Sequence, residues 1–414
     1  MMKRALALIA IGASLALVSL ASCTPKQTVQ EDFLLYDAED LARVRAEIQE
    51  GRGACLPAYR KLLEEADALL DSAAKAVIYK DILPPSGDKH DYMSQGPYWW
   101  PDPSKPDGLP YIRRDGERNP EIRNLVDREM LSFMADGVGT LGMAYYFSGD
   151  EKYAAKAAEF LRVWFLDPET KMNPNLNYSQ RIPGVCDGRG IGCIDVRCFA
   201  DMLAAVVMLR SSESWTDKDD AALQGWFSEF VTWLTESGNG LNEHSQPNNH
   251  GTFYDLQVAV EYMYIGRPDK AREYMESNTA FRFDQIGADG TQPRELARTN
   301  SIGYSTMNLR GLVMLAIVGE KLGLDFWNYT NTNGATLRDA IEWYFQYIFE
   351  GKPWEYQNIS KTKSLRGLYK SLLMSAEHYD AAGYRAVVDS LYARDGIDRE
   401  KQLSSREYLL YPVN

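Results

Sequence analysis

Histidine and cysteine are scarce in this sequence, which has four His and five Cys among its 414 residues. Three of the cysteines, Cys186, Cys193 and Cys198, lie close together, but their spacing matches no zinc site and no histidine lies near them. The common structural zinc motifs are therefore excluded for this segment. We expect either a disulfide within it, which an exported chain would permit, or buried free thiols.

Positive charge is also in deficit, because 45 Lys and Arg residues stand against 58 Asp and Glu and give a net charge of −13. This balance argues against nucleic acid as a partner. It argues equally against long-range attraction of an anionic substrate. A site for an anion in this protein must therefore be built locally, from arginines that the fold brings together.

Alternation of the kind that predicts β-strands is scarce, and helical periodicity dominates the chain. The segment YDAEDLARVRAEIQEG shows the pattern. It begins with Asp37 as the expected N-cap, places Leu41, Val44 and Ile48 on one face, and stops at Gly51. The following segment, from Cys55 onward, continues with the same period.

Three segments repeat one arrangement, in which a helix with an apolar or aromatic end is followed by a glycine, an acidic residue and an amphipathic helix. The turns fall at Gly149, Gly266 and Gly323. Recurrent helical hairpins of this kind stack into toroids or solenoids. We therefore predict an all-α fold, an (α/α)n toroid or barrel. Because no Pro/Ser-rich linker divides the chain, we expect a single domain over residues 32–414.

The N-terminus carries a short basic head, an apolar run to about Leu20, and then Ala21-Ser22-Cys23. This order is typical of a secretory signal, and the run is too short for a membrane-spanning helix of the mature chain. The residues up to Cys23 also resemble the lipobox of bacterial lipoproteins. We expect a signal peptide over 1–22, lipidation at Cys23 and a tether over 23–31. The mature protein would be exported and anchored to the outer membrane through its lipid alone.

Three long irregular segments, residues 83–120, 167–192 and 283–304, interrupt the helices and are rich in Arg, Asn, Tyr and Gly. Structureless segments of this length are uncommon in compact domains and are usually functional. In a helical toroid such loops can converge at one end, where a groove forms. We therefore expect the functional site there.

Two amides and an imidazole, Asn248, Asn249 and His250, stand at the predicted junction between a loop and a helix. A helix N-terminus favours an anion, Asn offers an amide donor, and His offers a donor or a base. The third loop adds Arg294, Arg298 and Tyr304. Arginine matches a carboxylate with a fixed fork, and nearby guanidinium charge is expected to stabilise the Tyr304 phenolate.

A carboxylate clamp combined with an amide, a His and a Tyr is suited to β-elimination on a uronic acid. The C5 proton lies alpha to the substrate carboxylate, so the enzyme must neutralise that group as an enolate-like dianion develops. A base removes the C5 proton, and an acid protonates the leaving O4. Tyrosine can perform both transfers when C5–H and O4 are syn, whereas His is the natural second group when they are anti. This chemistry requires no metal and no cofactor.

Asn249-His250, followed about fifty residues later by Arg298 and Tyr304, resembles the alginate-lyase-domain family of polysaccharide lyases. The first-loop motif YWWPDPSKPDGLPYIRRDGERNPE strengthens the resemblance, which covers roughly residues 92–369. Within the group, the chain resembles polysaccharide lyase family 38 most, with alginate and glucuronan lyases among its members, and family 5 more distantly. The resemblance implies that Asn249 and His250 bind the substrate carboxylate, that Arg298 supports them, and that Tyr304 is base and acid. Asn248 and Arg294 remain rivals for Asn249 and Arg298.

Further residues in the first two loops are candidates for binding sugar or polyanion. Aromatic side chains either stack on sugars or pack in the structure, and the arginines, Arg118 among them, either bind carboxylates or are solvated. The candidates are Tyr98, Trp99, Trp100, Arg113, Arg114, Tyr178, Arg181 and Arg189.

The leading prediction is an exported lyase whose partner is an anionic polysaccharide, alginate or a related polyuronate, with a glucuronan-specific lyase as a close alternative. A glycoside hydrolase on the same helical barrel is a rival, and it would need two carboxylates flanking the bond. Asp187, Asp195, Asp255 and Asp289 are available for that role, but no pairing is evident in the sequence. A second rival is a surface lipoprotein that binds glycans without catalysis.

Overall fold

The computed structural model describes residues 33–360 and 364–412. The described residues belong to one compact unit, Asp32–Asn414. The predicted signal peptide, Cys23 and the tether lie outside the described residues.

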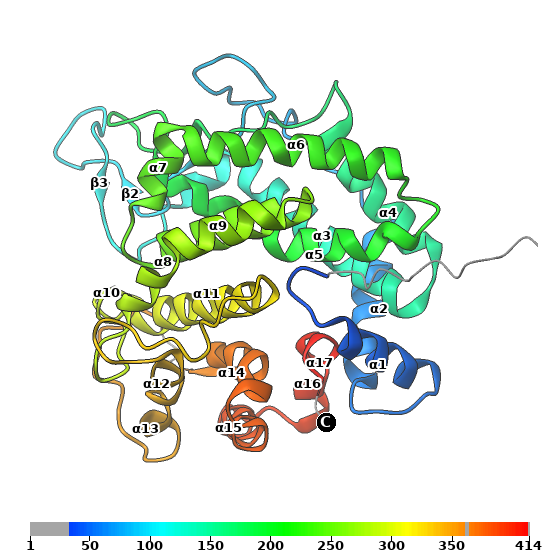
Figure 1. Cartoon of the computed structure of the whole chain (residues 1–414). Coiled ribbons are helices and arrows are strands. Elements are labelled where there is room, and N and C mark those ends of the chain that lie inside the picture. The colour runs from blue at the N-terminus through cyan, green and yellow to red at the C-terminus, as the bar shows by residue number, and fades with distance from the viewer. Residues whose placement is uncertain (1–32, 361–363, 413–414) are drawn as a thin grey trace, which may run out of the picture. The chain divides into compact units, whose positions relative to one another are not determined.

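Five helices form an inner row in which each packs against the next (Figure 1). They are α3 (Asp127–Ser148), α5 (Phe199–Met208), α8 (Asn249–Tyr264), α11 (Ser301–Lys321) and α14 (Tyr369–Ser375). Most of their residues are buried, because these helices are apolar nearly all round. Among the described helices, α11 alone is long and apolar enough to cross a membrane, and it lies mostly buried in the core.

A second set of helices covers the inner row and turns polar faces of its own toward the solvent. The set comprises α2 (Leu56–Leu70), α4 (Glu151–Leu161), α6 (Asp217–Glu236), α9 (Pro268–Asn278) and α15 (Ala381–Arg394). Helices α2 and α4 pack on α3, α6 and α9 pack on α8, and α15 packs on α14. The amphipathic periodicity of these segments matches this one-sided burial, so the predicted all-α fold of stacked helical hairpins is confirmed.

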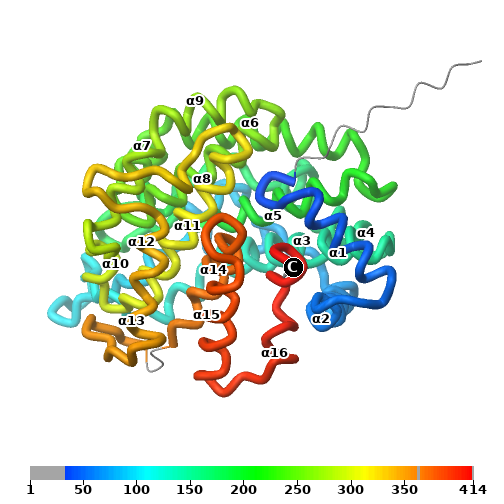
Figure 2. The backbone as a smooth tube through the Cα atoms, turned by 60° about the horizontal axis from the view of Figure 1, so that its bottom comes forward, coloured from blue at the N-terminus to red at the C-terminus, as the bar shows by residue number. Residues whose placement is uncertain are grey.

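Further helices complete the unit, and the last two of them bring the C-terminal part of the chain beside α1 and α2 (Figure 2). Helices α16 and α17 pack against α2, and α17 also contacts α1. The remaining α-helices are α1 (Ala38–Gln49), α7 (Gly238–His244), α10 (Pro293–Leu296), α12 (Leu337–Glu342), α13 (Phe345–Ile348), α16 (Arg399–Leu403) and α17 (Glu407–Leu410). The 3₁₀-helices are η1 (Pro120–Asn124), η3 (Gly190–Val196), η4 (Leu209–Ser211), η5 (Ala280–Gln285), η6 (Arg366–Leu368) and η7 (Ala376–His378), and η2 (Arg162–Leu166) is a short π-helix.

The predicted helix signals are largely confirmed. Asp37 accepts hydrogen bonds from the backbone N–H groups of Glu39 and Asp40, as an N-cap should. Gly149 and Gly266 adopt φ of +74° and +73°, the left-handed conformation that ends a helix, and α4 and α9 follow them directly.

The helix predicted to follow Gly323 is wrong. Gly323 does end α11, with φ of +74°, but the chain then runs as a loop until α12 begins at Leu337. Asp325 accepts hydrogen bonds from the backbone and side chain of Asn328, and Asn331 donates to the backbone of η5. These local side-chain bonds compete with helix formation, which is why Asp and Asn favour turns.

Two small sheets tie the loops together. Strand β1 (Met93–Gln95) pairs in parallel with β4 (Tyr178–Arg181), so the first predicted loop joins the second. Strands β2 (Trp99–Trp100) and β3 (Ile112–Arg113) form an antiparallel pair within the first loop. The third loop is partly helical, and Tyr304 lies on the first turn of α11 rather than in the loop. The four cysteines in the described residues are free thiols, so no disulfide closes the second loop.

Candidate active site

The N-terminus of α8 is formed as the sequence predicts. Asn248 is the N-cap, and its side-chain oxygen accepts a hydrogen bond from the backbone N–H of His250 at 3.3 Å. Asn249 and His250 therefore occupy the first turn of a helix that runs into the core. Helices α7, α8 and α10 and strands β2 and β3 gather at this end of the unit, on the left in Figure 1.

The imidazole of His250 is held by a buried carboxylate. Its Nδ1 lies 2.9 Å from Oε1 of Glu243, which comes from α7 and is fully buried. Burial raises the pKa of Glu243, and the charge and hydrogen bond of His250 oppose that rise. In the neutral imidazole, a hydrogen bond donated by Nδ1–H to this carboxylate leaves the lone pair on the other ring nitrogen, Nε2, as a base requires.

Asn249 is fixed by a second buried carboxylate, Glu295 of α10. Its backbone N–H donates to Oε1 at 2.7 Å, and its side-chain nitrogen lies 2.9 Å from both carboxylate oxygens. One N–H shared between two acceptors accounts for this geometry, and an amide nitrogen carries a second. The Asn249 side-chain oxygen is buried without a hydrogen-bond partner among the described residues. Glu295 thus positions the Asn249 amide, and it leaves the second N–H and the side-chain oxygen of Asn249 without a hydrogen bond to Glu295.

Tyr304 meets two groups from other parts of the chain. Its hydroxyl lies 2.7 Å from that of Tyr98, and the Arg298 guanidinium carbon lies 3.7 Å from its ring centroid. Burial, followed by the hydrogen bond with Tyr98, raises the pKa of Tyr304 above its ordinary value, and Arg298 works in the opposite direction. The predicted stabilisation by Arg298 is therefore present but outweighed, and Tyr304 rests as a neutral phenol.

Arg298 is oriented by Asp115, which joins the first loop to the third. Nε and Nη2 of Arg298 donate to the two Asp115 oxygens at 3.1 and 2.7 Å, a bidentate pair. Thr299 and Arg113 also donate to this carboxylate. Partial burial works to raise the pKa of Asp115, but the hydrogen bond and charge of Arg298 hold it well below its usual range. Asp115 is thus an ionised anchor.

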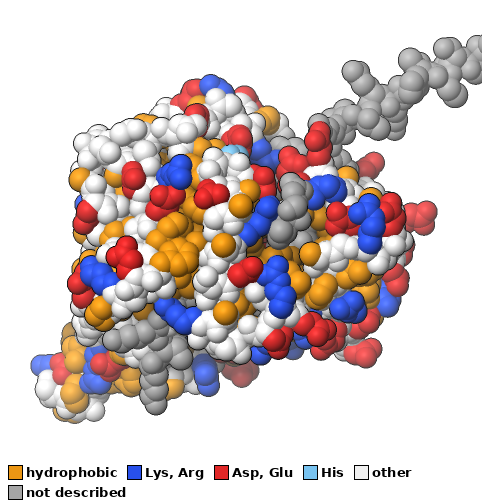
Figure 3. Space-filling view, turned by 90° about the horizontal axis from the view of Figure 1, so that it is seen from below, with side chains coloured by type: hydrophobic (Ala, Val, Ile, Leu, Met, Phe, Trp, Pro, Cys, Tyr) orange, Lys and Arg blue, Asp and Glu red, His pale blue; other side chains and the backbone are white. Residues whose placement is uncertain are grey.

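These groups line one cavity of about 400 Å³. Six arginines line it, whereas no Asp or Glu is among its described lining residues. On the face shown in Figure 3, by contrast, basic and acidic side chains are interspersed. The positive charge of the cavity is therefore local, as the net charge of the chain requires of any anion site. The lining arginines are Arg113, Arg118, Arg128, Arg189, Arg197 and Arg298.

The structure brings most of the residues proposed from sequence to this cavity and leaves others outside. Those that line it are Tyr98, Trp99, Arg113, Arg189, Asn248, Asn249, His250, Arg298 and Tyr304. Those that do not line it are Trp100, Arg114, Tyr178, Arg181 and Arg294. Arg294 is exposed on α10, and Arg114 lies over the ring of Trp100 at 5.2 Å. Of the two rival arginines, Arg298 is the one with access to the cavity.

Arg189 is held at the cavity by Gln180. Its Nε donates to the Gln180 backbone oxygen at 3.1 Å and its Nη2 to the side-chain oxygen at 2.9 Å, while Trp99 lies beside it at 5.8 Å. Gln180 adopts φ of +47°, which is uncommon for a residue other than glycine. The Gln180 side-chain nitrogen also donates to Asp195. The hydrogen bonds with Arg189 and Asp195 together maintain this uncommon backbone conformation.

Sequence reasoning missed two arginines in the cavity lining and several residues that hold the candidate groups in place. Arg128 and Arg197 line the cavity, and Glu243 and Glu295 hold the imidazole and the amide. Arg128 lies in the first turn of a helix, where a charged residue is usually exposed to solvent, so the sequence alone does not mark it as part of a site. Arg197 follows a segment without clear periodicity, so its position in the fold could not be predicted. The spacing of seven residues between Glu243 and His250 was a local signal that could have been noticed.

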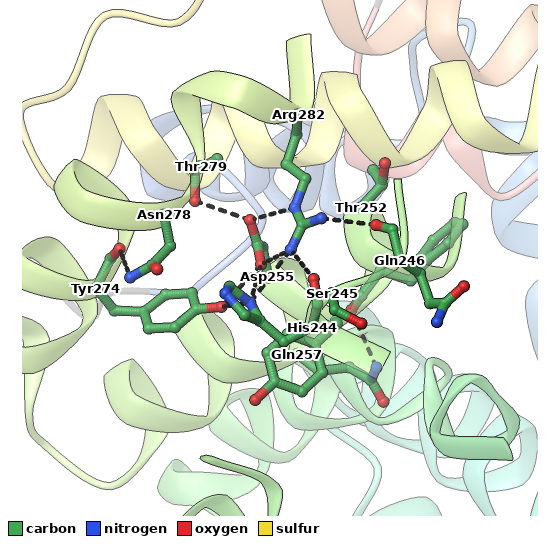
Figure 4. Close-up of polar contacts among 12 residues, drawn as sticks. His244, Ser245, Gln246, Thr252, Asp255, Gln257, Tyr274, Asn278, Thr279 and Arg282 are labelled. Carbon is green, nitrogen blue, oxygen red and sulfur yellow. Dashed lines mark hydrogen bonds and ion pairs between the residues drawn. The ribbon is translucent and has the colours of Figure 1, made fainter. Parts of the chain in front are cut away.

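The loop that leads into α8 is clamped by a buried arginine (Figure 4). Arg282 of η5 donates to Asp255 of α8 through Nε and Nη2 at 2.9 and 3.0 Å, and to the backbone oxygens of His244 and Gln246 at 2.7 and 2.8 Å. Tyr274 donates to the same Asp255 carboxylate at 2.8 Å. The buried ion pair is thus satisfied on both sides, and it fixes the backbone on either side of Ser245, immediately before Asn248.

Gly251 makes this close approach feasible, and replacing it tests the clamp. A Cβ at position 251 would lie 2.1 Å from Nη1 of Arg282 and 2.2 Å from the Gln246 oxygen. We expect Gly251→Ala to lower the unfolding free energy by about 1–3 kcal/mol and to lower kcat. Thermal unfolding and initial rates measure both. Gly225→Ala, whose Cβ would have no atom within 4 Å, is the control and should leave both unchanged or slightly raise stability. Normal kcat and stability in Gly251→Ala would contradict the clamp.

The comparisons with known proteins agree with this geometry. The family model described as alginate lyase matches residues 77–354. An alginate lyase from Bacteroides ovatus, known from its crystal structure, has 41% sequence identity and a TM-score of 0.85, over 92% of this chain and 99% of that one. No curated protein sequence matches the chain.

Alginate lyase A1-III from Sphingomonas species A1 is more distant, with 16% identity and a TM-score of 0.55 over 93% of this chain and 97% of that one. A substituted form of A1-III complexed with a tetrasaccharide gives a TM-score of 0.58 at the same identity and coverage. At this identity the likeness concerns the fold. The family model and the Bacteroides structure, each spanning most of the chain, show that this protein belongs to the alginate lyase family and is a polysaccharide lyase.

Proposed function

We propose that the protein cleaves alginate, a 4-linked polyuronate, by β-elimination and leaves a C4–C5 unsaturated uronate at the new non-reducing end. The observation that carries this proposal is one cavity in which Asn249, His250, Arg298 and Tyr304 meet. The names of the similar structures support alginate as the substrate, because the Bacteroides and Sphingomonas proteins are alginate lyases.

In the proposed reaction, the substrate carboxylate lies against Asn249 and His250 in the first turn of α8, where the helix dipole favours an anion. Asn249 offers its second N–H, and Arg298 adds positive charge. These groups stabilise the charge that develops when the C5 proton leaves. Tyr304, neutral at rest, donates its proton to O4 as the bond breaks.

The base depends on the sugar. On mannuronate, C5–H and O4 are syn, so Tyr304 can receive the C5 proton once ionised and return a proton to O4. On guluronate they are anti, and His250 takes the C5 proton through Nε2 from the opposite face. Glu243 supports this role because it holds the His250 tautomer in which Nε2 is unprotonated.

The lining of the cavity disfavours hydrolysis. A glycoside hydrolase needs two carboxylates beside the scissile bond, whereas no carboxylate lines this cavity among its described residues. Asp195 is buried in contact with Tyr92, Ser94 and Gln180, and Asp255 is paired with Arg282. Neither is free to act on a sugar.

The proposal is tested by following ultraviolet absorbance of the conjugated C4–C5 double bond on a panel of mannuronate-rich, guluronate-rich and glucuronate polymers. We expect absorbance to rise with the alginate polymers. A rise with the glucuronate polymer alone would identify a glucuronan lyase instead. Absence of a signal on every polymer would contradict elimination.

The ionisation of Tyr304 gives a second prediction. Since the pKa of Tyr304 is raised, kcat/KM on mannuronate polymer should rise with pH over about pH 7 to 10 without a plateau. The Tyr98 hydrogen bond raises that pKa, so Tyr98→Phe should move the rise to lower pH. Arg298 lowers it, so Arg298→Gln should move the rise to higher pH. Profiles that shift together, or not at all, would show that Tyr304 is not the titrating base.

We also propose that the protein is exported and anchored through a lipid on Cys23, on the strength of the N-terminal sequence pattern. Replacing Cys23 with Ser should release the protein from the membrane fraction into the soluble fraction. Metabolic labelling with a radioactive fatty acid should mark the original chain and not the variant. A variant that stays in the membrane fraction would contradict lipidation at this residue.

A further inference from the structure

Glu261, near the C-terminal end of α8, has a buried carboxyl group that the proposed reaction does not use. The residue is 1% exposed, and both of its side-chain oxygens are buried without a hydrogen-bond partner among the described residues. A buried carboxylate that keeps its negative charge requires a cation or several hydrogen-bond donors around it. The surroundings of Glu261 therefore decide whether the group can be charged.

The elements that pack on α8 offer Glu261 no free positive charge in the described part of the chain. Helices α5, α6 and α9 bury only apolar residues, and α11 buries only uncharged ones. The charged residues buried on α7 and η3 are acidic, Glu243 and Asp195. The buried arginine of η5, Arg282, is paired with Asp255. An ionised Glu261 would therefore carry an uncompensated charge.

The neutral polar groups around Glu261 point the same way. Gln257 stands one turn earlier on the same face of α8, and its side-chain oxygen is also buried without a partner, because the amide nitrogen donates to the Phe253 backbone at 3.0 Å. A proton on Glu261 supplies an O–H donor where donors are missing. Cys193 of η3 and Tyr254 of α8 are close enough to respond to a charge on Glu261, and burial raises the pKa of both, so neither is charged near pH 7. Burial alone raises the pKa of Glu261 as well.

We propose that Glu261 is a neutral carboxylic acid in the folded protein and that α8 loses stability when this group loses its proton. In the unfolded chain, Glu261 has its ordinary pKa of 4.5 and gives its proton to the solvent above that pH. The folded state therefore binds more protons than the unfolded state, and its stability falls as the pH rises, until Glu261 ionises in the folded protein too. Since α8 carries Asn249 and His250 on its first turn, the active site depends on a helix that is sensitive to alkali.

The first test compares Glu261→Gln with Glu229→Gln in the full chain. Gln keeps the shape of a carboxylic acid but cannot ionise, and Glu229 is an exposed residue of α6 that serves as the matched control. Relative to the unaltered chain, the ratio of folded to unfolded Glu261→Gln should rise about tenfold for each pH unit above about pH 5. The relative ratio for Glu229→Gln should stay constant. Denaturant unfolding between about pH 5 and 8 gives these ratios, and a constant relative ratio for Glu261→Gln would overturn the proposal.

Infrared spectroscopy of the unaltered chain gives a second test, which stands even if Glu261→Gln does not fold. The carbonyl stretch of a protonated carboxylic acid lies apart from the bands of carboxylates and amides. We expect this band in the folded protein at about pH 7 and expect it to vanish on unfolding at the same pH, because an exposed glutamate is ionised there. Folded Glu261→Gln should show a weaker band. No band in the unaltered chain, or an undiminished band in Glu261→Gln, would overturn the proposal.

The proton on Glu261 should also decide how long the protein survives in alkali. At about pH 9, the half-life of activity should be about tenfold longer for Glu261→Gln than for the unaltered chain and for Glu229→Gln. At about pH 5 the three half-lives should agree. Equal half-lives at both pH values would show that this proton does not protect α8. This measurement requires lyase activity, whereas the unfolding and infrared measurements do not, so failure of the proposed function would leave the inference testable.

Discussion

Replacing Tyr304 with Phe is expected to lower kcat by about 10²–10⁴-fold or more on every polyuronate that the protein cleaves. The proposed mechanism uses the Tyr304 hydroxyl to protonate O4 in each turnover, and on mannuronate also to remove the C5 proton. The Phe ring keeps its packing under Arg298, so the fold should survive. The Tyr98 hydroxyl loses one partner but lines the cavity, where water can replace it.

The control for this variant is Tyr254→Phe. Tyr254 lies on α8, and its buried hydroxyl donates to the backbone oxygen of Leu234 at 2.9 Å without lining the cavity. Its loss should lower the unfolding free energy by about 1 kcal/mol and leave kcat near normal. Initial rates and circular dichroism compare the two. A folded Tyr304→Phe enzyme with near-normal rates would contradict the assignment of Tyr304.

Replacing His250 with Asn should reduce cleavage next to guluronate by about 10²–10⁴-fold, the usual contribution of a general base. Next to mannuronate, where Tyr304 serves as base, the loss should be only about tenfold, from a weakened contact with the substrate carboxylate. Asn retains a polar side chain but has no basic nitrogen. Initial rates on mannuronate-rich and guluronate-rich polymers measure the difference.

Glu243→Gln is the matched companion to this experiment. The Gln oxygen can still accept from Nδ1–H of His250, so the ring stays in place while the negative charge beside it is lost. We expect a loss on guluronate that is smaller than that of His250→Asn, and little change on mannuronate. An equal loss on both polymers for His250→Asn would contradict the proposed division between the two bases.

Local signals in the sequence were sufficient to predict most of the helices and the helix N-terminus at which Asn249 and His250 lie. Asn248 caps α8 because its side chain reaches an N–H two residues ahead, and Gly149 and Gly266 end helices through their own backbone conformation. Such interactions span a few residues, so the sequence exposes them directly. The loop after Gly323 shows the limit of the same reasoning, since several turn-favouring Asp and Asn residues outweighed the apolar periodicity there.

Contacts between distant residues decided what the sequence left open. Arg298 lines the cavity and Arg294 does not, and the guanidinium of Arg298 is oriented there by Asp115, 183 residues away. Asn249 is positioned by Glu295, which lies 46 residues downstream. Neither the Arg298–Asp115 pair nor the Asn249–Glu295 pair can be predicted from a local pattern, because both depend on how the loops meet at the end of the helices.

The pKa of Tyr304 illustrates a balance that sequence cannot weigh. An arginine six residues away correctly predicts a lowering influence. Burial, and the hydroxyl of Tyr98 brought from 206 residues away, outweigh it. The residue is therefore better prepared as an acid than as a base in the resting protein. On mannuronate, where Tyr304 must ionise to serve as the base, the reaction is expected to accelerate with pH.

Digestion of polymannuronate in water enriched with heavy oxygen distinguishes elimination from hydrolysis. Elimination breaks the C4–O4 bond and adds no water, so we predict products that carry a C4–C5 double bond and contain no heavy oxygen from the cleavage step. Mass spectrometry and proton nuclear magnetic resonance identify both features. Saturated products, each one water heavier and labelled with heavy oxygen, would show hydrolysis and contradict the account.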